Sequence, residues 1–446
     1  MNTKRLAVIG AGTLVISVSV VIGRGVGDPF GDASGRSGPA VLPAAAAAPT
    51  DHRSATDAIA QAIDTAQAAL KQSPDDAAQW AALGSAYVEQ GRATADPAYY
   101  PKADGALHKS LTLQPADNLT AMVGMGMLAN ARHDFATAKD WADKALAFAA
   151  ANATAVGVLV DADTQLGDYA GATAAAQRML DLRPGVAAFT RASYDAEQHG
   201  HEAIAKEALQ RALADATTPA DTAFCHHYLG ELAFNSGDPH TALTEYRQAL
   251  HDDATYTPAL ASAAKAEAAL GDNAGALRDY EDATARLPLP QYVLEYGELL
   301  ESLGRSGDAK TQYAVLDAEQ KLFAANGVLD DLTTAQFLSD HGDPQQAVAH
   351  ARAEWGRRHS VLVADALAWA LHKNGQDSEA IDYARQAAAL GWPNSLFAYH
   401  RGVIEAALGR PAAARADLAA ALSINPDFSP LQGPQAHALL ARLGGS

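Results

Sequence analysis

Cysteine is almost absent from this sequence. Cys225 is the single cysteine among 446 residues. One thiol cannot close an intramolecular disulfide, and it cannot supply the paired cysteines of a zinc site. The sequence therefore excludes the disulfide-stapled folds and the cysteine-rich metal-binding folds. Because Cys225 falls within a helical pattern, we expect it to be buried as a small apolar side chain.

Basic residues are also scarce. The chain has 33 Lys and Arg against 52 Asp and Glu, a formal net charge of −19, and no cluster of basic residues. A protein that binds nucleic acid needs a positive face to neutralise phosphates. We therefore expect no nucleic-acid partner, and the acidity is consistent with a need for solubility. Aromatic residues make up 7% of the chain, which is few for a β-sandwich, while abundant alanine favours an all-α fold.

The common catalytic motifs are missing as well. The sequence has no G-x-x-x-x-G-K-[ST] phosphate loop, no G-x-S-x-G motif and no H-E-x-x-H motif. Cys225, His226 and His227 are adjacent, but neighbours on a helix point about 100° apart and cannot converge on one ion. We expect His226 to pack in the core and His227 to face a binding groove. The sequence thus predicts no catalytic residues, no metal site and no cofactor.

The N-terminus carries an uncharged apolar run. Lys4 and Arg5 precede Leu6–Gly23, which has no charged residue. This run is slightly shorter than the roughly 20 residues of a spanning helix and longer than the roughly 7–15 residues of a signal-peptide core. No A-x-A cleavage site follows it directly, which favours a signal-anchor helix at residues 6–23 over a cleaved signal peptide. In both cases the positive end should remain in the cytoplasm and the rest should be exported. The sequence predicts a single-pass protein of the cell membrane or, alternatively, a secreted protein.

Residues 24–53 are rich in glycine, proline and alanine and have little to bury, so they are expected to form a flexible linker. From Ser54 onward, apolar residues recur with a helical period. The expected organisation is therefore a signal-anchor or signal peptide at residues 1–23, a linker at 24–53 and a helical domain at 54–446.

The helical domain is built from an internal repeat. An alanine recurs at a spacing of about 33–38 residues, at Ala103, Ala138, Ala172, Ala205, Ala242, Ala276, Ala309, Ala347, Ala380 and Ala414. A glycine precedes most of these alanines, at Gly167, Gly200, Gly237, Gly271, Gly304, Gly342, Gly375 and Gly409. Such a glycine can end one helix with a positive φ, and the alanine lets the next helix approach closely. Each unit is thus expected to be a helix, a tight turn and a second helix.

Trp80, Leu83, Gly84 and Tyr87 match the W-x2-L-G-x2-Y signature, and in this motif and its period the chain resembles the tetratricopeptide repeat (TPR) family. The resemblance implies an α-solenoid, with about ten repeats forming a right-handed superhelix. First helices are expected to begin near Ala77, Leu119, Ala153, Val186, Ala223, Thr257, Pro290, Val328, Val361 and Ser395. A lone helix near residues 54–72 and a last helix near residues 434–443 would cap the ends.

In TPR proteins the first helices line a concave groove that holds ligands, usually peptides. Carried over residue by residue, the resemblance implies that the candidate binding residues are Tyr194, Glu197, His227, Glu231, Phe234, Lys265, Glu298, Glu301, Gln336, Trp369, His372, Lys373 and Tyr399. The acidic middle of this set suggests a basic or mixed-charge partner. The first repeat carries extra residues, and Tyr99 and Tyr100 within them are loop candidates that either project toward a partner or pack back on the array.

One partner class does not fit. The TPR domains that clamp a C-terminal carboxylate need Lys and Asn at inner positions, where this chain has Ala81, Ser85, Val123 and Met127. The resemblance implies a non-enzymatic scaffold that binds peptide or protein partners in its groove, and the apolar run at residues 6–23 predicts that this scaffold is tethered to the membrane and extracytoplasmic. Two alternatives remain open: a secreted binder of peptides or glycans, and a regulatory subunit of an envelope enzyme complex.

Overall fold

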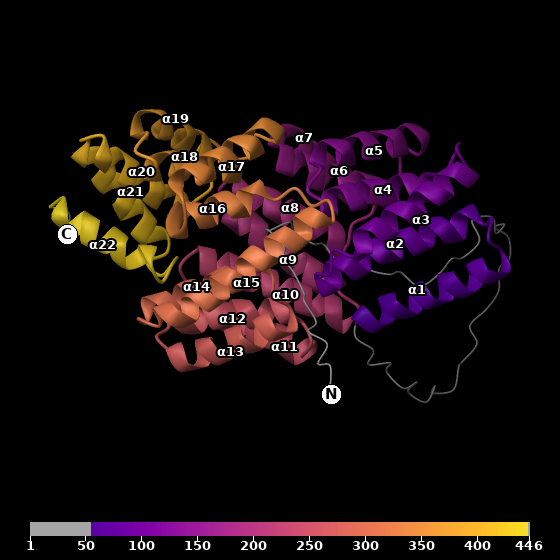
Figure 1. Cartoon of the computed structure of the whole chain (residues 1–446), viewed down its shortest axis with the longest axis horizontal. Coiled ribbons are helices and arrows are strands. Elements are labelled where there is room, and N and C mark those ends of the chain that lie inside the picture. The colour runs from indigo at the N-terminus through magenta and orange to yellow at the C-terminus, as the bar shows by residue number, and fades with distance from the viewer. Residues whose placement is uncertain (1–54, 445–446) are drawn as a thin grey trace, which may run out of the picture.

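The computed structural model describes residues 55–444, and within this range the chain forms α-helices without a single strand. There are 22 of them: α1 (Ala55–Gln72), α2 (Ala77–Thr94), α3 (Tyr99–Leu113), α4 (Leu119–Ala131), α5 (Phe135–Phe148), α6 (Ala153–Leu166), α7 (Tyr169–Leu182), α8 (Val186–Gln198), α9 (Glu202–Asp215), α10 (Pro219–Asn235), α11 (Pro239–Asp252), α12 (Thr257–Ala269), α13 (Asn273–Arg286), α14 (Pro290–Ser302), α15 (Ser306–Ala325), α16 (Asp331–His341), α17 (Pro344–Arg357), α18 (Val361–Lys373), α19 (Asp377–Ala387), α20 (Ser395–Ala407), α21 (Pro411–Ile424) and α22 (Gln432–Arg442). This confirms the expected all-helical solenoid (Figure 1).

The predicted signal-anchor or signal peptide and the linker lie outside the described residues. Between residues 55 and 444, no helix combines the length and the apolar character needed to cross a membrane.

Glycine and aspartate together build the turn inside each helix pair. Gly237 has a φ of 80° and ends α10, and Asp238 then caps α11 by accepting a hydrogen bond from the amide of Thr241 at 3.0 Å. Gly271 and Asp272 repeat this arrangement before α13, with a φ of 83° and a cap distance of 2.9 Å. The left-handed glycine reverses the chain, and the aspartate satisfies an otherwise unpaired amide of the next helix.

Small residues let the two helices of a pair touch. Gly230 of α10 faces Tyr246 of α11, and a Cβ at Gly230 would overlap the Tyr246 ring. Gly84 faces Leu107 in the same way, with only 2.5 Å available for a Cβ. Tyr246 is fully buried, as the repeat pattern requires. Each pair therefore has its own small core, which neighbouring pairs extend along the array.

The expected number of ten repeats is an undercount. The structure has 22 helices, which is the number in eleven pairs. Ten consecutive pairs run from α2 to α21, and α1 and α22 each supply half of a further unit at the two ends. Both end helices cover the apolar face of the adjoining pair: Ile59 and Ile63 of α1 pack with Leu83, and Ala436 of α22 packs with Leu418.

The superhelix closes on itself. Figure 1 shows α17 lying beside α7, although nine helices separate them in sequence. The amide of His359 donates a hydrogen bond to the carbonyl of Leu166 at 3.0 Å, and the amide of Leu329 donates to Arg132 at 2.9 Å. Farther along, the Asn425 side chain donates to the carbonyl of Phe234 at 2.8 Å, across 191 residues. The early turns of the array thus meet the late linkers.

We call this contact the seam. Its first side consists of the turns that follow α4, α6, α8 and α10. Its second side consists of the linkers that follow α15, α17, α19 and α21. The contacts span 191–197 residues, which corresponds to between five and six repeats of about 34 residues. One turn of the superhelix therefore takes between five and six helix pairs, and the next turn docks directly against it.

Candidate functional site: the concave face

The first helix of each pair lines the inner, concave side of the superhelix. The structure places the predicted groove residues on seven of these helices, α8, α10, α12, α14, α16, α18 and α20. Most of their side chains contact one another or the seam. The predicted residues therefore form a few polar clusters and a separate set that the second superhelical turn covers.

The first polar cluster is centred on Glu231 of α10. The Lys265 ammonium lies 3.2 Å from Glu231 Oε2, and the Tyr246 hydroxyl donates to Glu231 Oε1 at 2.6 Å. Burial opposes ionisation of this carboxyl, but Lys265 and the hydroxyl groups outweigh it and lower the pKa of Glu231 to about 2. Lys265 also lies 4.8 Å from the ring centroid of Phe234. Glu231 is therefore an ionised carboxylate whose charge is already compensated.

His227 borders this cluster and is 8% exposed. Its Nε2 lies 3.1 Å from the Ser262 hydroxyl, and burial lowers the pKa of His227 to about 4. Its neighbour His226 lies on the other side of the helix, with Nδ1 2.6 Å from Glu245 of α11. His227, expected to face the groove, is buried, whereas His226, expected in the core, is partly exposed. His227 packs against Ser262 of α12 and the rings of Tyr246 and Tyr256, whereas His226 faces Glu245 of the paired helix α11.

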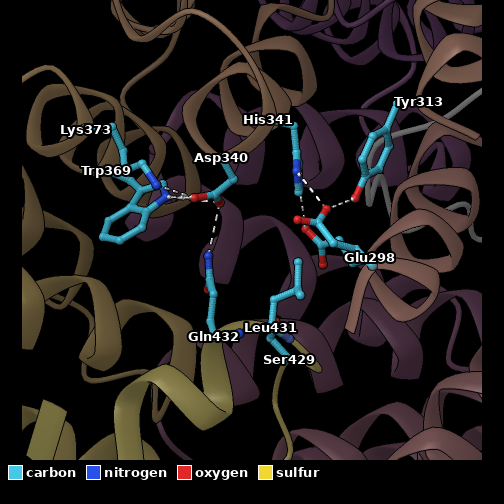
Figure 2. Close-up of polar contacts among 10 residues, drawn as sticks. Glu298, Tyr313, Asp340, His341, Trp369, Lys373, Ser429, Leu431 and Gln432 are labelled. Carbon is cyan, nitrogen blue, oxygen red and sulfur yellow. Dashed lines mark hydrogen bonds and ion pairs between the residues drawn. The ribbon is translucent and has the colours of Figure 1, made fainter. Parts of the chain in front are cut away.

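The second cluster joins α14, α15 and α16 (Figure 2). His341 lies between two carboxylates, with Nε2 3.3 Å from Glu298 and Nδ1 3.5 Å from Glu301. The Tyr313 hydroxyl donates to Glu301 at 2.9 Å. Burial alone would favour the neutral imidazole, but Glu298 and the neighbouring carboxylates raise the pKa of His341. The predicted residues Glu298 and Glu301 are thus brought together by a histidine that the sequence reasoning missed.

Asp340 is the centre of the third cluster and was also missed. It accepts hydrogen bonds from Trp369 Nε1 at 3.0 Å, from the Lys373 ammonium at 3.1 Å and from Gln432 Nε2 at 3.1 Å. Figure 2 shows Gln432 reaching Asp340 from the C-terminal segment. The Ser429 hydroxyl accepts from the Gln432 amide at 3.1 Å and so fixes the start of α22. The C-terminal cap therefore occupies part of the predicted groove.

The remaining candidates are dispersed. Tyr399 is 2% exposed and donates to Gln435 of α22 at 3.0 Å. His372 turns toward Asp377, 2.5 Å away, at the next helix start. Gln336 is partly buried on α16. Trp369 is 5% exposed and stacks on His400 with ring centroids 4.0 Å apart, so it is a packed residue rather than an open contact surface.

Tyr194 and Glu197 lie at the seam. The Tyr194 ring meets Trp392 of the α19–α20 linker edge to face, with centroids 6.1 Å apart. Glu197 accepts a hydrogen bond from Asn235 at 3.0 Å and interacts with the Trp392 side chain. Burial raises the pKa of Glu197 to about 7. These two predicted groove residues are thus covered by a later part of the same chain.

The two loop candidates lie on a helix instead of in a loop. Tyr99 and Tyr100 open α3. Tyr100 is 4% exposed and packs against Gly91, whereas Tyr99 is partly buried with its ring 5.9 Å from that of Tyr87. The extra residues of the first repeat lengthen α2 and α3 and bring these tyrosines back onto the array.

An open pocket lies elsewhere on the concave face. It has a volume of ≈ 360 Å³ and is formed by α1, α2, α4 and α6, with the lining residues Ile59, Ala62, Ala82, Ser85, Ala86, Glu89, Leu119, Thr120, Val123, Met127, Asn152 and Thr154. Its one charged lining residue, Glu89, is paired with Arg92 at 3.0 Å. The sequence carried a signal for this pocket, because small residues occupy the inner positions of α2 and leave space there.

Within residues 55–444 no group of three or more His, Cys, Asp or Glu side chains is placed to hold a metal ion. Cys225 is fully buried, and burial raises the pKa of its thiol to about 12. The thiol is therefore protected from reaction in the folded chain.

No protein-family model and no curated protein matches the chain. Among solved structures it is similar to the APC/C hetero-tetramer Cut9–Hcn1, at 14% identity and a TM-score of 0.40, over 87% of this chain and 93% of that chain. It is also similar to yeast Tom70, at 13% identity and a TM-score of 0.37, over 86% and 93% of the two chains. A third similar structure is PilW, a type IV pilus biogenesis factor, at 17% identity and a TM-score of 0.39, over 46% of this chain and 94% of that chain. Likeness at this level carries no functional argument, so function is inferred from the groove of this chain itself.

Proposed function

We propose that this protein is a non-enzymatic scaffold that binds a peptide segment of a protein partner on its concave face, with the pocket between α1, α2, α4 and α6 as the primary contact. The observation that carries the proposal is the pocket itself, an open space of ≈ 360 Å³ on the side of the array that the first helices line. This volume lies within the range of about 300–1,000 Å³ that small-ligand sites occupy.

The lining of the pocket selects an uncharged, aliphatic segment. The apolar surface of the pocket comes from Ile59, Leu119, Val123 and Met127, and the small side chains of its alanines leave space for a ligand. Asn152 already caps α6 through the Ala155 amide at 2.8 Å, so its oxygen is engaged. A charged ligand group would lose its hydration here without gaining a partner, whereas aliphatic side chains would gain by burial.

The central clusters are weaker candidates for the same peptide. Glu231, Glu298 and Asp340 already have cationic or hydroxyl partners within 2.6–3.3 Å. A partner would have to replace those contacts with equally good ones to bind there. The earlier expectation of a basic partner for the acidic middle is therefore replaced by an aliphatic partner for the open pocket.

Membrane tethering belongs to the same proposal and rests on the sequence of residues 6–23. An anchor there, followed by a linker of about 30 residues, would present the array on the exported side of the membrane. The alternatives are a secreted binder of peptides or glycans after signal cleavage, and a regulatory subunit of an envelope enzyme complex. Mass spectrometry of the mature N-terminus separates the first alternative from the tether: a mature chain beginning near Pro49 would exclude the anchor.

A peptide array tests the binding site. Full-length protein is applied to immobilised ten-residue peptides that differ in aliphatic and charged content. The retained peptides should be rich in Ala, Val and Leu. Ala82→Phe fills the pocket and should weaken retention at least tenfold, whereas Ala136→Phe, at an exposed alanine of α5, should leave it unchanged. Retention of charged peptides that Ala82→Phe does not affect would exclude the pocket.

A further inference from the structure

The seam repeats once per helix pair, and its contacts are of one kind. Each time, the turn of an early pair meets the linker of a late pair. The His359 amide donates to Leu166 at 3.0 Å, the Val361 amide donates to the Tyr169 hydroxyl at 2.8 Å, and the Asn425 side chain donates to Phe234 at 2.8 Å. Each of these contacts is a hydrogen bond that involves at least one backbone group, whereas helix pairs pack through apolar cores. Loop contacts of this kind open more readily than a core does.

Three turn glycines fit against the seam with no space to spare. A Cβ at Gly167 would lie 2.5 Å from the His359 carbonyl oxygen, and one at Gly200 would lie 2.7 Å from the Gly391 oxygen. At Gly237 it would overlap the Ile424 oxygen. The equivalent glycines of later pairs, Gly271 and Gly304, have the same left-handed backbone and no atom within 4 Å. Close approach is therefore a property of the seam and is not required by the turn.

The two ends of the seam differ. Near its start, Phe323 and Val328 share one apolar core with Met125 and Leu128 of α4. Near its end, by contrast, Gly237 and Phe234 meet Ile424 and Asn425 through backbone and amide groups. The apolar end is the stronger contact, so opening should begin at the C-terminal end and hinge near Phe323.

The seam also covers residues that would otherwise face the groove. Trp392, in the linker between α19 and α20, lies against Tyr194 and Glu197 of α8. The covering segment is thus a late linker of the same chain. These inner residues are consequently occupied in cis.

We propose that the seam is a latch: it holds the superhelix closed and covers Tyr194 and Glu197, on the inner face of α8, with the linker between α19 and α20, and this face becomes available only when the seam opens. The latch does not depend on the pocket between α1, α2, α4 and α6, which lies on the first helix pairs. The pocket is thus open whether or not the seam is closed, whereas Tyr194 and Glu197 are exposed only when the seam opens.

The experiment uses full-length variants at matched glycines. Gly167→Ala and Gly237→Ala place a methyl group in the seam, and Gly271→Ala and Gly304→Ala place one in open space. All four substitutions carry the same left-handed backbone strain, since φ lies between 76° and 87° at each position. Any difference between the two pairs therefore reports the seam.

Two measurements report opening of the seam, and a third reports whether the helix pairs stay packed. In the seam variants, small-angle X-ray scattering should give a larger radius of gyration than in the controls. Amide hydrogen exchange at His359 and Val361 should be at least tenfold faster. The Cys225 thiol, fully buried between α8 and α10, should remain unreactive toward Ellman's reagent in all four variants, because the helix pairs stay packed.

The latch is overturned by either of two results. In the first, the seam variants match the controls in both radius and exchange, so the seam is not closed in solution. In the second, Cys225 becomes reactive together with the seam amides, so the seam cannot open without unfolding the pairs. Neither result bears on peptide retention by the pocket, so the two proposals fail separately.

Discussion

Arg358 and Gln165 are bonded side chain to side chain across 193 residues of sequence. Helical repeat arrays are normally quasi-one-dimensional, because each unit contacts only its neighbours. Here the guanidinium of a late linker reaches an early first helix, and the same relationship recurs along the seam. We therefore expect this array to unfold more cooperatively than an open solenoid of equal length.

Tyr246 tests the register of the repeat. It is fully buried against Gly230, so Tyr246→Ala should cost about 3–5 kcal/mol, as for a buried aromatic truncation. Tyr246→Phe keeps the ring and loses only the hydroxyl bond to Glu231, which should cost about 1.5–3 kcal/mol. Chemical denaturation followed by circular dichroism measures both. Two equal costs would place the ring outside the core.

Glu197 predicts a pH dependence. Burial raises the pKa of its carboxyl from 4.5 to about 7, and Asn235, Trp392, Glu231 and Glu202 surround the carboxyl. A carboxyl whose pKa is raised in the folded state binds its proton more tightly there than in the unfolded state. The free energy of unfolding should therefore fall as the pH rises from 4.5 to 7 and then level off. Each pKa unit corresponds to about 1.4 kcal/mol. Because the Glu197 side chain is only partly buried, we expect a smaller loss of stability than the full pKa shift would give.

Thermal unfolding at pH 5 and pH 8 checks this prediction. Glu197→Gln should be more stable than the parent at pH 8 and should lose part of the pH dependence. Glu207→Gln, at an exposed ion pair with Arg211 on α9, is the control and should change neither. A parent whose stability rises between pH 5 and pH 7 through Glu197 would contradict the sign.

Trp369 was expected to act in binding, and the structure changes that expectation. Its ring stacks on His400, and its Nε1 donates to Asp340 at 3.0 Å, so Trp369→Ala should mainly destabilise, by about 3–5 kcal/mol. Trp369→Phe should recover much of the loss. Denaturation midpoints of the two variants give the comparison. A near-neutral Trp369→Ala would return this residue to the open groove.

The local architecture was predictable from the sequence because it depends on local residues. The helices at Thr257 and Pro290 begin at the predicted residues, since a period of alanine and glycine sets them. Two starts were displaced. The helix predicted near Ala223 begins at Pro219, where Thr218 supplies the cap, and the one predicted near Val328 begins at Asp331, after its cap Asp330. Capping residues decided these boundaries, and the repeat pattern did not include them.

The candidate site was less predictable. Inner positions such as Glu231 and Trp369 follow from helix periodicity, and the structure does place them on the first helices. Helix periodicity does not, however, predict which side chains these residues contact. Gln432 meets Asp340, and Trp392 meets Tyr194, because small rotations between pairs accumulate until one superhelical turn reaches the next. No short stretch of sequence determines this accumulated rotation.

Arg358 offers the sharpest test of the seam as a stability element. It is 3% exposed, bonded to Glu354 and Gln165, with its guanidinium carbon 4.9 Å from the centroid of Phe135. Removing one partner of a buried ion pair costs about 3–5 kcal/mol; because Arg357 still pairs with Glu354, we expect Arg358→Leu to cost about 3 kcal/mol, the lower end of that range. Arg357→Leu, at a neighbouring arginine whose side chain is 33% exposed, should cost much less.

The double variant Arg358→Leu with Glu354→Leu separates charge from packing. Replacing a whole buried pair by apolar residues is often neutral, so the double variant should recover most of the loss in urea denaturation. Its seam should nevertheless be weaker, because the bond to Gln165 is gone, and exchange at His359 should stay faster than in the parent. Recovered stability with restored protection at His359 would mean that backbone bonds alone close the seam. Faster exchange despite recovered stability would show that the side-chain bond across the two superhelical turns is what holds them together.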